Sequence, residues 1–327
     1  YIPLLGAYGT SFMVATLGSL LCAVLIFGKK NVFLPMVLLL LILVTGNVLR
    51  NVEFTKHTGK TLTVALVQGA IPQPLKWERS LREWSIDRYS ALTEPHWGVD
   101  LVVWPETAIP GFESEVTRQI AHLRTKSQVQ GTDLVVGMPT WDLGTGKYFN
   151  SIINFRGSPL EKYDKRHLVP FGEYLPAKNY LSGFNAVLDV PMSDFSAGSE
   201  TGGELSVAGE IAGVSICYEV AFSGQIREAL PNATFLLNLS NDAWFGRSLA
   251  PHQHLQIAQV RALESGRELL RATNNGITVI LDHRGEIRAR AEQFDSTVLT
   301  GNLNSRSGST PFVKYGSWAV FFFMFFG

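Results

Sequence analysis

The sequence predicts an α/β domain attached to membrane-spanning helices. Between about residues 60 and 305, short runs of β-branched and apolar residues alternate with stretches in which apolar residues recur every three or four positions. These are the patterns of buried strands and amphipathic helices. Hydrophobic residues make up 46% of the chain and charged residues only 17%, and the apolar excess is concentrated at the ends, which favours membrane segments there.

Two N-terminal segments contain no charged residue and are each long enough to cross a hydrocarbon core of about 30 Å as a helix. They are residues 8–27 and 31–49. Lys29 and Lys30 lie in the tight turn between them, and the positive-inside rule places this turn in the cytoplasm. The second helix then delivers the chain to the opposite face. A cleaved signal peptide is the less favoured alternative, because its apolar core would be shorter and no small-residue cleavage site precedes the folded part.

The middle of the chain is expected to form seven strands and three helices. The expected strands are residues 61–68, 100–104, 133–137, 151–155, 211–216, 234–239 and 276–282. The expected helices are residues 77–92, 113–129 and 252–270. Two consecutive strands, 133–137 and 151–155, have no helix between them, so the sheets should be mixed. Residues 187–209 are rich in Ser, Gly, Asp and Glu and are expected to form an exposed loop, with a turn at 144–146.

The C-terminal residues 316–327, GSWAVFFFMFFG, are apolar and aromatic but too short to span a bilayer. The chain also begins without Met, so we expect a piece of a longer membrane protein. The expected organisation is two transmembrane helices in residues 1–50, a catalytic domain in residues 58–306, and the start of a C-terminal transmembrane helix in residues 312–327.

Composition and cysteine usage exclude several classes of function. The formal net charge is zero, which argues against a nucleic-acid partner. Cys22 lies in the first apolar segment and Cys217 far outside it, so no internal disulfide is expected. His252 and His254 have the wrong spacing for one helical face, and no CxxC, HExxH or Gly-rich phosphate loop is present. We therefore expect no metal and no cofactor.

Cys217, in the sequence SICYE, lies where an apolar strand gives way to a polar turn. That is a rigid position for a nucleophile, although free cysteines are also common as inert, buried small residues. Two other segments end in the same way. Glu106 follows the strand in DLVVWPETAIP, and Lys165 and Glu173 lie in the loop of EKYDKRHLVPFGEYLP.

A cysteine nucleophile needs a base to take its proton and a cation to hold the developing negative charge. Glu106 and Lys165 would supply these two parts, with a backbone N–H near Tyr218 as a further donor to the oxyanion. Taken singly, a Glu after Trp-Pro could be a helix N-terminal carboxylate, and a Lys in a charged loop is usually solvated. Three such residues, each at the end of an element, favour a catalytic triad.

The series WPE, YDKRHLVPFGEYLP and CYE resembles the nitrilase, or carbon-nitrogen hydrolase, superfamily with its Glu-Lys-Cys triad. More narrowly, QGAIPQPLKW, HLVPFGEYLP, LSNDAWFG and RALESGRELLRATNNG resemble the apolipoprotein N-acyltransferase family. The resemblance implies a multi-pass protein of the bacterial inner membrane, whose catalytic domain is an αββα sandwich on the periplasmic face. It also implies a phospholipid acyl donor, a thioester intermediate, and the amine of a diacylglyceryl apolipoprotein as acceptor.

Other residues would shape such a site. Glu173 and Glu219 could orient the lysine or hold the incoming amine, or they could be ordinary surface acids. Five aromatic residues at loops and element ends are candidates for contacts with acyl chains, with core packing as the alternative. They are Trp77, Phe171, Tyr174, Trp244 and Phe245. Two other functions remain open: a membrane-attached amidohydrolase of the same superfamily, and a catalytically inactive nitrilase-like binding module.

Overall fold

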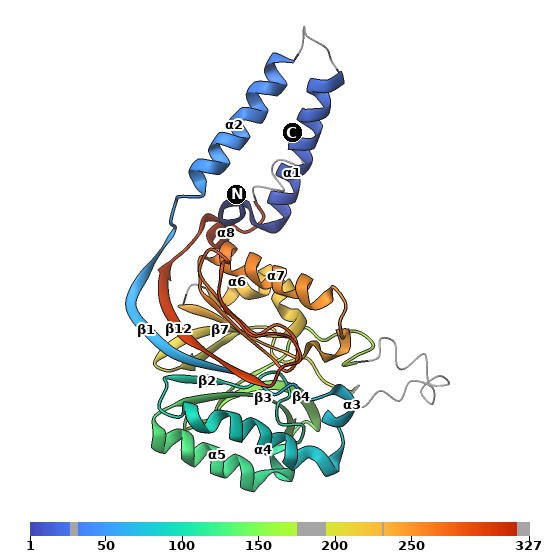
Figure 1. Ribbon diagram of the computed structural model, residues 1–327, viewed down its shortest axis with the longest axis vertical. Helices are drawn as coiled ribbons and strands as arrows, with labels where there is room; N and C mark the ends of the chain where they lie inside the picture. Colours follow the sequence, from blue (N-terminus) through green and yellow to red (C-terminus); the bar gives the residue numbers. More distant parts are fainter. Residues whose placement is uncertain (27–31, 175–193, 231, 319–327) are drawn as a thin grey trace, which may run out of the picture.

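Two six-stranded sheets packed face to face form the centre of the computed structural model (Figure 1), which describes residues 1–26, 32–174, 194–230 and 232–318. The first sheet has the strand order β12-β1-β2-β3-β4-β5 and the second β11-β10-β9-β8-β7-β6. The strands of the first sheet are β1 (Thr55–Gln68), β2 (Leu101–Val103), β3 (Asp133–Asp142), β4 (Lys147–Asn154), β5 (Glu161–Asp164) and β12 (Thr297–Gly308). Those of the second are β6 (Glu204–Val207), β7 (Glu210–Ile216), β8 (Phe235–Ser240), β9 (Leu269–Thr273), β10 (Val279–Leu281) and β11 (Ile287–Arg290).

Each sheet has three parallel strands with antiparallel strands on both sides. In the first sheet β1, β2 and β3 are parallel, with Leu101 paired to Val64 and to Asp133. In the second sheet β7, β8 and β9 are parallel. Because the carboxyl ends of parallel strands meet at one edge of a sheet, residues that directly follow β2 and β7 lie at sheet edges, where ligands commonly bind.

Helices cover the outer face of each sheet, so the domain has the predicted αββα sandwich fold. The outer helices are α4 (Arg82–Thr93) and α5 (Thr117–Gln130) on the first sheet, and α6 (Ser223–Ala229) and α7 (Ala250–Ser265) on the second. One apolar cluster fills the space between the sheets, and Leu66 and Leu237 are both fully buried in it. Two further clusters join α4 and α5 to the first sheet and α6 and α7 to the second. Burial of these faces is the main force that holds the layers together.

Two apolar helices extend from the sandwich as a pair (Figure 1): α1 (Ile2–Ile26) and α2 (Phe33–Leu49). By length and hydropathy, α1 could cross a membrane, whereas the 17-residue α2 is a shorter apolar helix than the predicted span. The turn that carries Lys29 and Lys30 lies outside the described residues. At the other end of the chain, α8 (Pro311–Tyr315) is described, and residues 319–327 are not.

The base of α1 is fixed to the sandwich at a kink. Gly6 has φ 70°, and a side chain there would come within 2.3 Å of the Phe312 ring. Glycine is therefore required both for the backbone conformation and for the close contact. One residue further on, the Ala7 N–H donates to Glu264 Oε1 at 2.6 Å, and Glu264 belongs to α7.

All seven predicted strands correspond to observed ones, but the predicted helix 252–270 is too long. The helix ends at Ser265, because Gly266 adopts a left-handed conformation with φ 64°, and β9 follows directly. The predicted helix ran on through Arg267 and Glu268, which are charged but buried: Arg267 donates to the Ala233 carbonyl, and Glu268 pairs with Arg288.

The predicted helix 77–92 is also wrong at its start. Trp77 instead follows the short helix α3 (Gln73–Lys76), and α4 begins at Arg82. The spacing of Trp77, Leu81, Trp84 and Leu92 also predicts one apolar face for this helix, but Trp84 is 42% exposed, with the Arg88 guanidinium above its ring. The predicted loop 187–209 contains β6, and its residues 187–193 lie outside the described part of the chain.

Candidate active site

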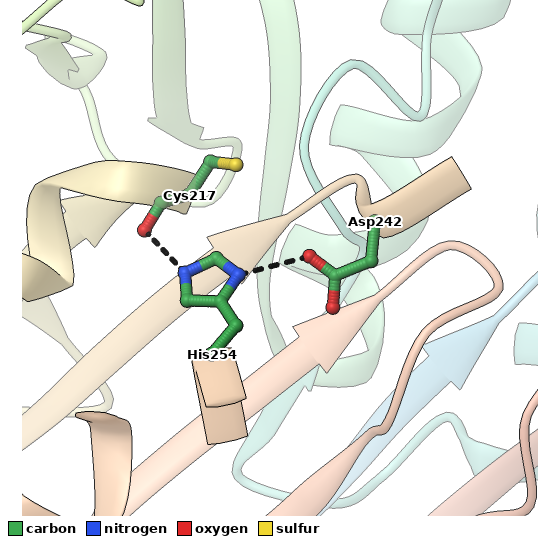
Figure 2. A group of neighbouring side chains, drawn as sticks. All are labelled: Cys217, Asp242 and His254. Atoms are coloured by element: carbon green, nitrogen blue, oxygen red, sulfur yellow. Dashed lines mark hydrogen bonds and ion pairs between the residues drawn. The ribbon is translucent and has the colours of Figure 1, made fainter. Parts of the chain in front are cut away.

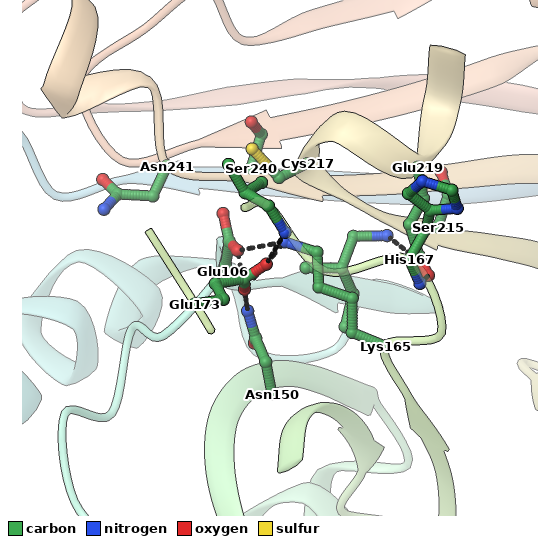
Figure 3. A network of polar contacts seen from close by, with 12 residues as sticks. Glu106, Asn150, Lys165, His167, Glu173, Ser215, Cys217, Glu219, Ser240 and Asn241 are labelled. Carbon is green, nitrogen blue, oxygen red and sulfur yellow. Dashed lines mark hydrogen bonds and ion pairs between the residues drawn. The ribbon is translucent and has the colours of Figure 1, made fainter. Parts of the chain in front are cut away.

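The three predicted triad residues come together at the ends of three strands (Figure 3). Glu106 follows β2, Lys165 follows β5, and Cys217 follows β7. Lys165 Nζ lies 3.4 Å from Glu106 Oε1, and both side chains are almost completely buried. Burial opposes a charged lysine, but the carboxylates of Glu106 and Glu173 outweigh it and hold the pKa of Lys165 above its usual range. Lys165 is therefore an ammonium ion at neutral pH.

Glu173 and Asn150 support this ion pair. Glu173 Oε1 lies 2.9 Å from Lys165 Nζ, and its other oxygen accepts the Val169 N–H at 2.9 Å. Asn150, in β4, donates its amide to both Glu106 and Glu173, at 2.8 and 2.9 Å. The predicted contact between Glu173 and the lysine is thus present, and the amide holds the two carboxylates at a fixed separation.

A second buried cation lies behind the triad. Lys76 is 2% exposed, and its Nζ donates to the backbone carbonyl of Glu106 at 2.9 Å. Burial lowers the pKa of Lys76 to about 8, although the nearby Glu106 and Cys217 act in the opposite direction. The site therefore contains two carboxylates and two lysines, so with Cys217 as a neutral thiol its charges balance.

Cys217 has a strained backbone, with φ 51° in a non-glycine residue. It begins the short 3-10 helix Cys217–Ala221 (η5), directly after β7. Burial and the Glu106 carboxylate raise the pKa of the Cys217 thiol to about 12, against the opposing effect of Lys165. The thiol is therefore protonated at rest, and a neighbouring base must remove its proton before it can act as a nucleophile.

Glu219 has a different position from the one predicted. Its fully buried carboxylate does not contact Lys165. Instead it accepts the backbone N–H groups of Ile216, Arg166 and His167, at 2.7 to 3.0 Å. Burial and this carboxylate raise the pKa of Tyr163, whose hydroxyl donates to Glu219 at 2.9 Å. Glu219 thus joins the turn that carries Cys217 to the segment that carries Lys165.

His254, in α7, contacts the backbone carbonyl of Cys217 (Figure 2). Its Nε2 lies 3.1 Å from the Cys217 carbonyl oxygen, and its Nδ1 lies 3.0 Å from Asp242 Oδ1. Asp242 in turn pairs with Arg271 at 2.8 Å, with both side chains completely buried. Burial opposes ionisation of Asp242, but Arg271 and His254 hold its pKa well below the usual range.

Cys217, Asp242 and His254 are also close enough to be considered as metal ligands, because their donor atoms lie within 4.8 Å of one another. Both nitrogens of His254 and the facing oxygen of Asp242 already have hydrogen-bond partners, however. The carbonyl oxygen of Cys217, rather than its sulfur, faces the imidazole ring. These three residues therefore form a hydrogen-bonded network.

A cavity of about 740 Å³ opens onto the triad. Its apolar wall includes four of the five aromatic residues predicted to contact acyl chains, namely Trp77, Phe171, Trp244 and Phe245. Phe171 is 62% and Trp244 63% exposed, so core packing does not explain them. Tyr174, the fifth, is not among the residues that line the cavity, whereas Tyr218 lines it and is half-exposed.

Comparison with known families shows the family of the chain. The carbon-nitrogen hydrolase family matches residues 63–312, which include all three triad residues. The chain belongs to the carbon-nitrogen hydrolase family. Among solved structures, the chain is similar to Nit3 of Saccharomyces cerevisiae, a member of branch 10 of the nitrilase superfamily. The TM-score is 0.57 at 19% identity, over 77% of this chain and 92% of Nit3. A carbon-nitrogen hydrolase of Helicobacter pylori gives a TM-score of 0.56 at 16% identity, over 75% and 89% of the two chains.

Two curated relatives are named apolipoprotein N-acyltransferase. The protein of Methylococcus capsulatus is 37% identical over 317 residues, covering 97% of this chain and 63% of the relative. That of Vibrio vulnificus is 39% identical over 276 residues, covering 82% and 54%. The chain thus spans less than two thirds of the length of these relatives.

Three residues of this carbon-nitrogen hydrolase site were not predicted: Lys76, Asn150 and His254. Lys76 lies in the motif QPLKW and Asn150 within a strand, and neither has a local pattern that marks it as part of a site. His254 was considered only as a metal ligand. The available signal was that His254 lies four residues before Ala258, on the helix face that is buried.

Proposed function

We propose that this protein transfers an acyl chain from a phospholipid, through a thioester on Cys217, to the N-terminal amine of the diacylglyceryl cysteine of an apolipoprotein. The observation that carries the proposal is the cavity, which is lined both by Glu106, Lys165 and Cys217 and by exposed aromatic side chains. Such a wall suits a lipid chain better than a small polar amide. The names of the curated relatives support the same reaction.

In the first half-reaction, Glu106 takes the proton of the Cys217 thiol and the thiolate attacks the ester carbonyl of the phospholipid. The new C–S bond leaves an oxyanion, which Lys165 and the Tyr218 N–H stabilise. Collapse of this intermediate breaks the ester C–O bond. Glu106 then returns the proton to the departing lysophospholipid alkoxide, and a thioester remains on Cys217.

In the second half-reaction, the acceptor amine attacks the thioester carbonyl and Glu106 accepts a proton from the amine nitrogen. The C–S bond breaks, the amide is formed, and Glu106 returns the proton to the Cys217 thiolate. The enzyme is thereby restored to its resting charge state. Asn150 and Glu173 act by positioning, since they keep Glu106 and Lys165 at a fixed separation.

The proposed location is the bacterial inner membrane, with the catalytic domain on the periplasmic face. The apolar helix α1 and the exposed apolar surface of α2 support a membrane anchor. The exposed aromatic side chains at the cavity, such as Phe171 and Trp244, are of the kind found at bilayer interfaces. A phospholipid donor would then enter the cavity directly from the adjacent leaflet.

The test is intact-mass analysis of the full-length protein after incubation with phospholipid, with Cys217→Ser as the matched control. We expect an added mass of one acyl chain in the wild type and none in the variant. The adduct should disappear quickly when a diacylglyceryl-cysteine peptide is added, and N-acylated peptide should appear. An adduct that is hydrolysed equally fast without the peptide would support the membrane-attached amidohydrolase, and a wild type with no adduct would support the inactive binding module.

A further inference from the structure

The peptide bond that follows Cys217 is held by two side chains that contact its carbonyl oxygen. Its carbonyl oxygen lies 3.1 Å from His254 Nε2 and accepts a weaker bond from the Asn238 amide at 3.4 Å. In a trans peptide, the C=O and the next N–H point in opposite directions. Two donors that fix the Cys217 carbonyl therefore also fix the direction of the Tyr218 N–H. Within the described part of the chain, no hydrogen-bond acceptor is found for that N–H.

The orientation of His254 does not depend on its charge. A carbonyl oxygen can only accept, so Nε2 must carry the proton that points at Cys217. In the neutral ring, Nδ1 accepts from Arg271 Nη2 at 2.9 Å, and in the protonated ring Nδ1 donates to Asp242 at 3.0 Å. Both states keep the bond to Cys217. Arg271 also donates to Asn238, so the same buried arginine orients both donors to the Cys217 carbonyl.

We propose that His254 is a positioning residue for acyl transfer, which holds the peptide between Cys217 and Tyr218 so that the Tyr218 N–H faces the oxyanion. Cys217 needs such support because its φ of 51° is unfavourable for a residue with a side chain. The bond to the carbonyl also polarises the amide, which strengthens its N–H as a donor. This inference rests on the proposed thioester chemistry.

Two substitutions of His254 separate this role from general support of the fold. The amide nitrogen of Gln in His254→Gln lies near the position of Nε2, so this variant can still donate to the Cys217 carbonyl but loses the contact with Asp242. The amide of Asn in His254→Asn lies near Nδ1, so it keeps the Asp242 contact and cannot reach Cys217. His252→Phe is the control on the same helix, because His252 is exposed and does not line the cavity.

The experiment uses full-length protein in detergent and p-nitrophenyl octanoate with a ¹³C-labelled carbonyl as the acyl donor. The burst of p-nitrophenolate gives the acylation rate, and isotope-edited infrared spectra give the stretching frequency of the thioester carbonyl, which falls when an oxyanion donor polarises it. We expect His254→Asn to acylate about 10²-fold more slowly, near the loss of one oxyanion donor. Its thioester band should move to higher frequency, whereas His254→Gln should retain most of the rate and the wild-type band.

The reverse order, with His254→Gln more impaired than His254→Asn, would show that the contact with Asp242 is what matters and would overturn the inference. An unshifted thioester band in His254→Asn would overturn it as well, whatever the rate. If the wild type forms no adduct, the thioester chemistry itself fails. A different result, in which the wild type acylates normally and His254→Asn is equally active, would refute only the role of His254.

Discussion

Replacing Lys76 by Met should remove a charge that the fold keeps buried at a cost in stability. Burial lowers the pKa of Lys76 from its ordinary value of 10.5 to about 8. Because one pKa unit corresponds to about 1.4 kcal/mol, the ammonium costs the folded state about 3 kcal/mol at pH 7. Substitution also leaves the Glu106 carbonyl without its donor, which costs about 1–3 kcal/mol. The net effect at pH 7 is therefore small.

The dependence on pH is the sharper measurement. Below pH 8, Lys76 is charged in both the folded and unfolded states, and the full cost is present. Between pH 8 and 10.5 the folded protein loses this proton first, so the cost declines as pH rises and is absent above 10.5. The wild type should gain about 1 kcal/mol from Lys76 between pH 7 and pH 9, and Lys76→Met should not.

Thermal unfolding of wild type and variant at the two pH values measures this difference directly. For a domain of this size, about 1 kcal/mol corresponds to about 2–4 °C in Tm, so the Tm of Lys76→Met relative to wild type should fall by that amount from pH 7 to pH 9. Lys147→Met, at an exposed lysine, is the control and should show no such change. A constant difference in Tm for Lys76→Met would refute the depressed pKa.

Activity at pH 7 should fall in Lys76→Met even though the net stability changes little. Without Lys76, two carboxylates face one lysine, and the excess negative charge disfavours the Cys217 thiolate. We expect Lys76→Met to slow acylation about 10-fold or more at pH 7, while Lys76→Arg, which keeps the cation, should retain more of the rate. Equal acylation rates in Lys76→Met and the wild type would show that Lys76 serves only the fold.

Four further predictions follow: three concern the rest of the site and one concerns the orientation in the membrane. Glu106→Gln or Lys165→Ala should slow thioester formation by about 10² to 10⁴-fold, and burst kinetics at the wild-type rate in either variant would contradict their roles. Glu219→Gln should lower the stability by about 2–3 kcal/mol, seen as a fall in Tm, because its amide nitrogen meets backbone donors; an unchanged Tm would be the contrary result. Trp244→Ala should reduce kcat/KM about 10-fold more for a long-chain donor than for an acetyl ester, and an equal loss for both would exclude contact with the chain. A cysteine introduced at Asp142 should react with a membrane-impermeant reagent from the periplasm, and labelling only from the cytoplasm would reverse the proposed orientation.

The sequence was sufficient for the fold class and for the three side chains that carry the proposed chemistry. Strand patterns are local, and so is the position of a polar residue directly after a strand, as for Glu106 and Cys217. The error at β9 has a physical cause. Arg267 and Glu268, directly before β9, are charged but buried, so the spacing of apolar and charged residues did not show which face was inside.

The supporting residues could not be predicted for a different reason. Lys76 contacts the backbone of Glu106, 30 positions away, and His254 contacts that of Cys217, 37 positions away. Neither contact involves a characteristic pair of side chains, because the partner is a carbonyl group that every residue possesses. The actual contacts of Glu219 could not be predicted for the same reason, since three of its donors are backbone N–H groups.

The attachment of α1 and α2 to the sandwich limits how the protein can meet its substrates. Only residues 50–54 separate α2 from β1, a stretch that spans at most about 21 Å when fully extended. The bond from Ala7 to Glu264 also fixes α1 to α7, and the close contact of Phe312 with Gly6 fixes α1 to α8. In the proposed membrane location, a domain held in this way could not travel far from the bilayer surface to collect a distant polypeptide. Both substrates of the proposed reaction would therefore reach it by lateral diffusion in the membrane, so turnover at low substrate density would be governed by a two-dimensional search and by membrane fluidity.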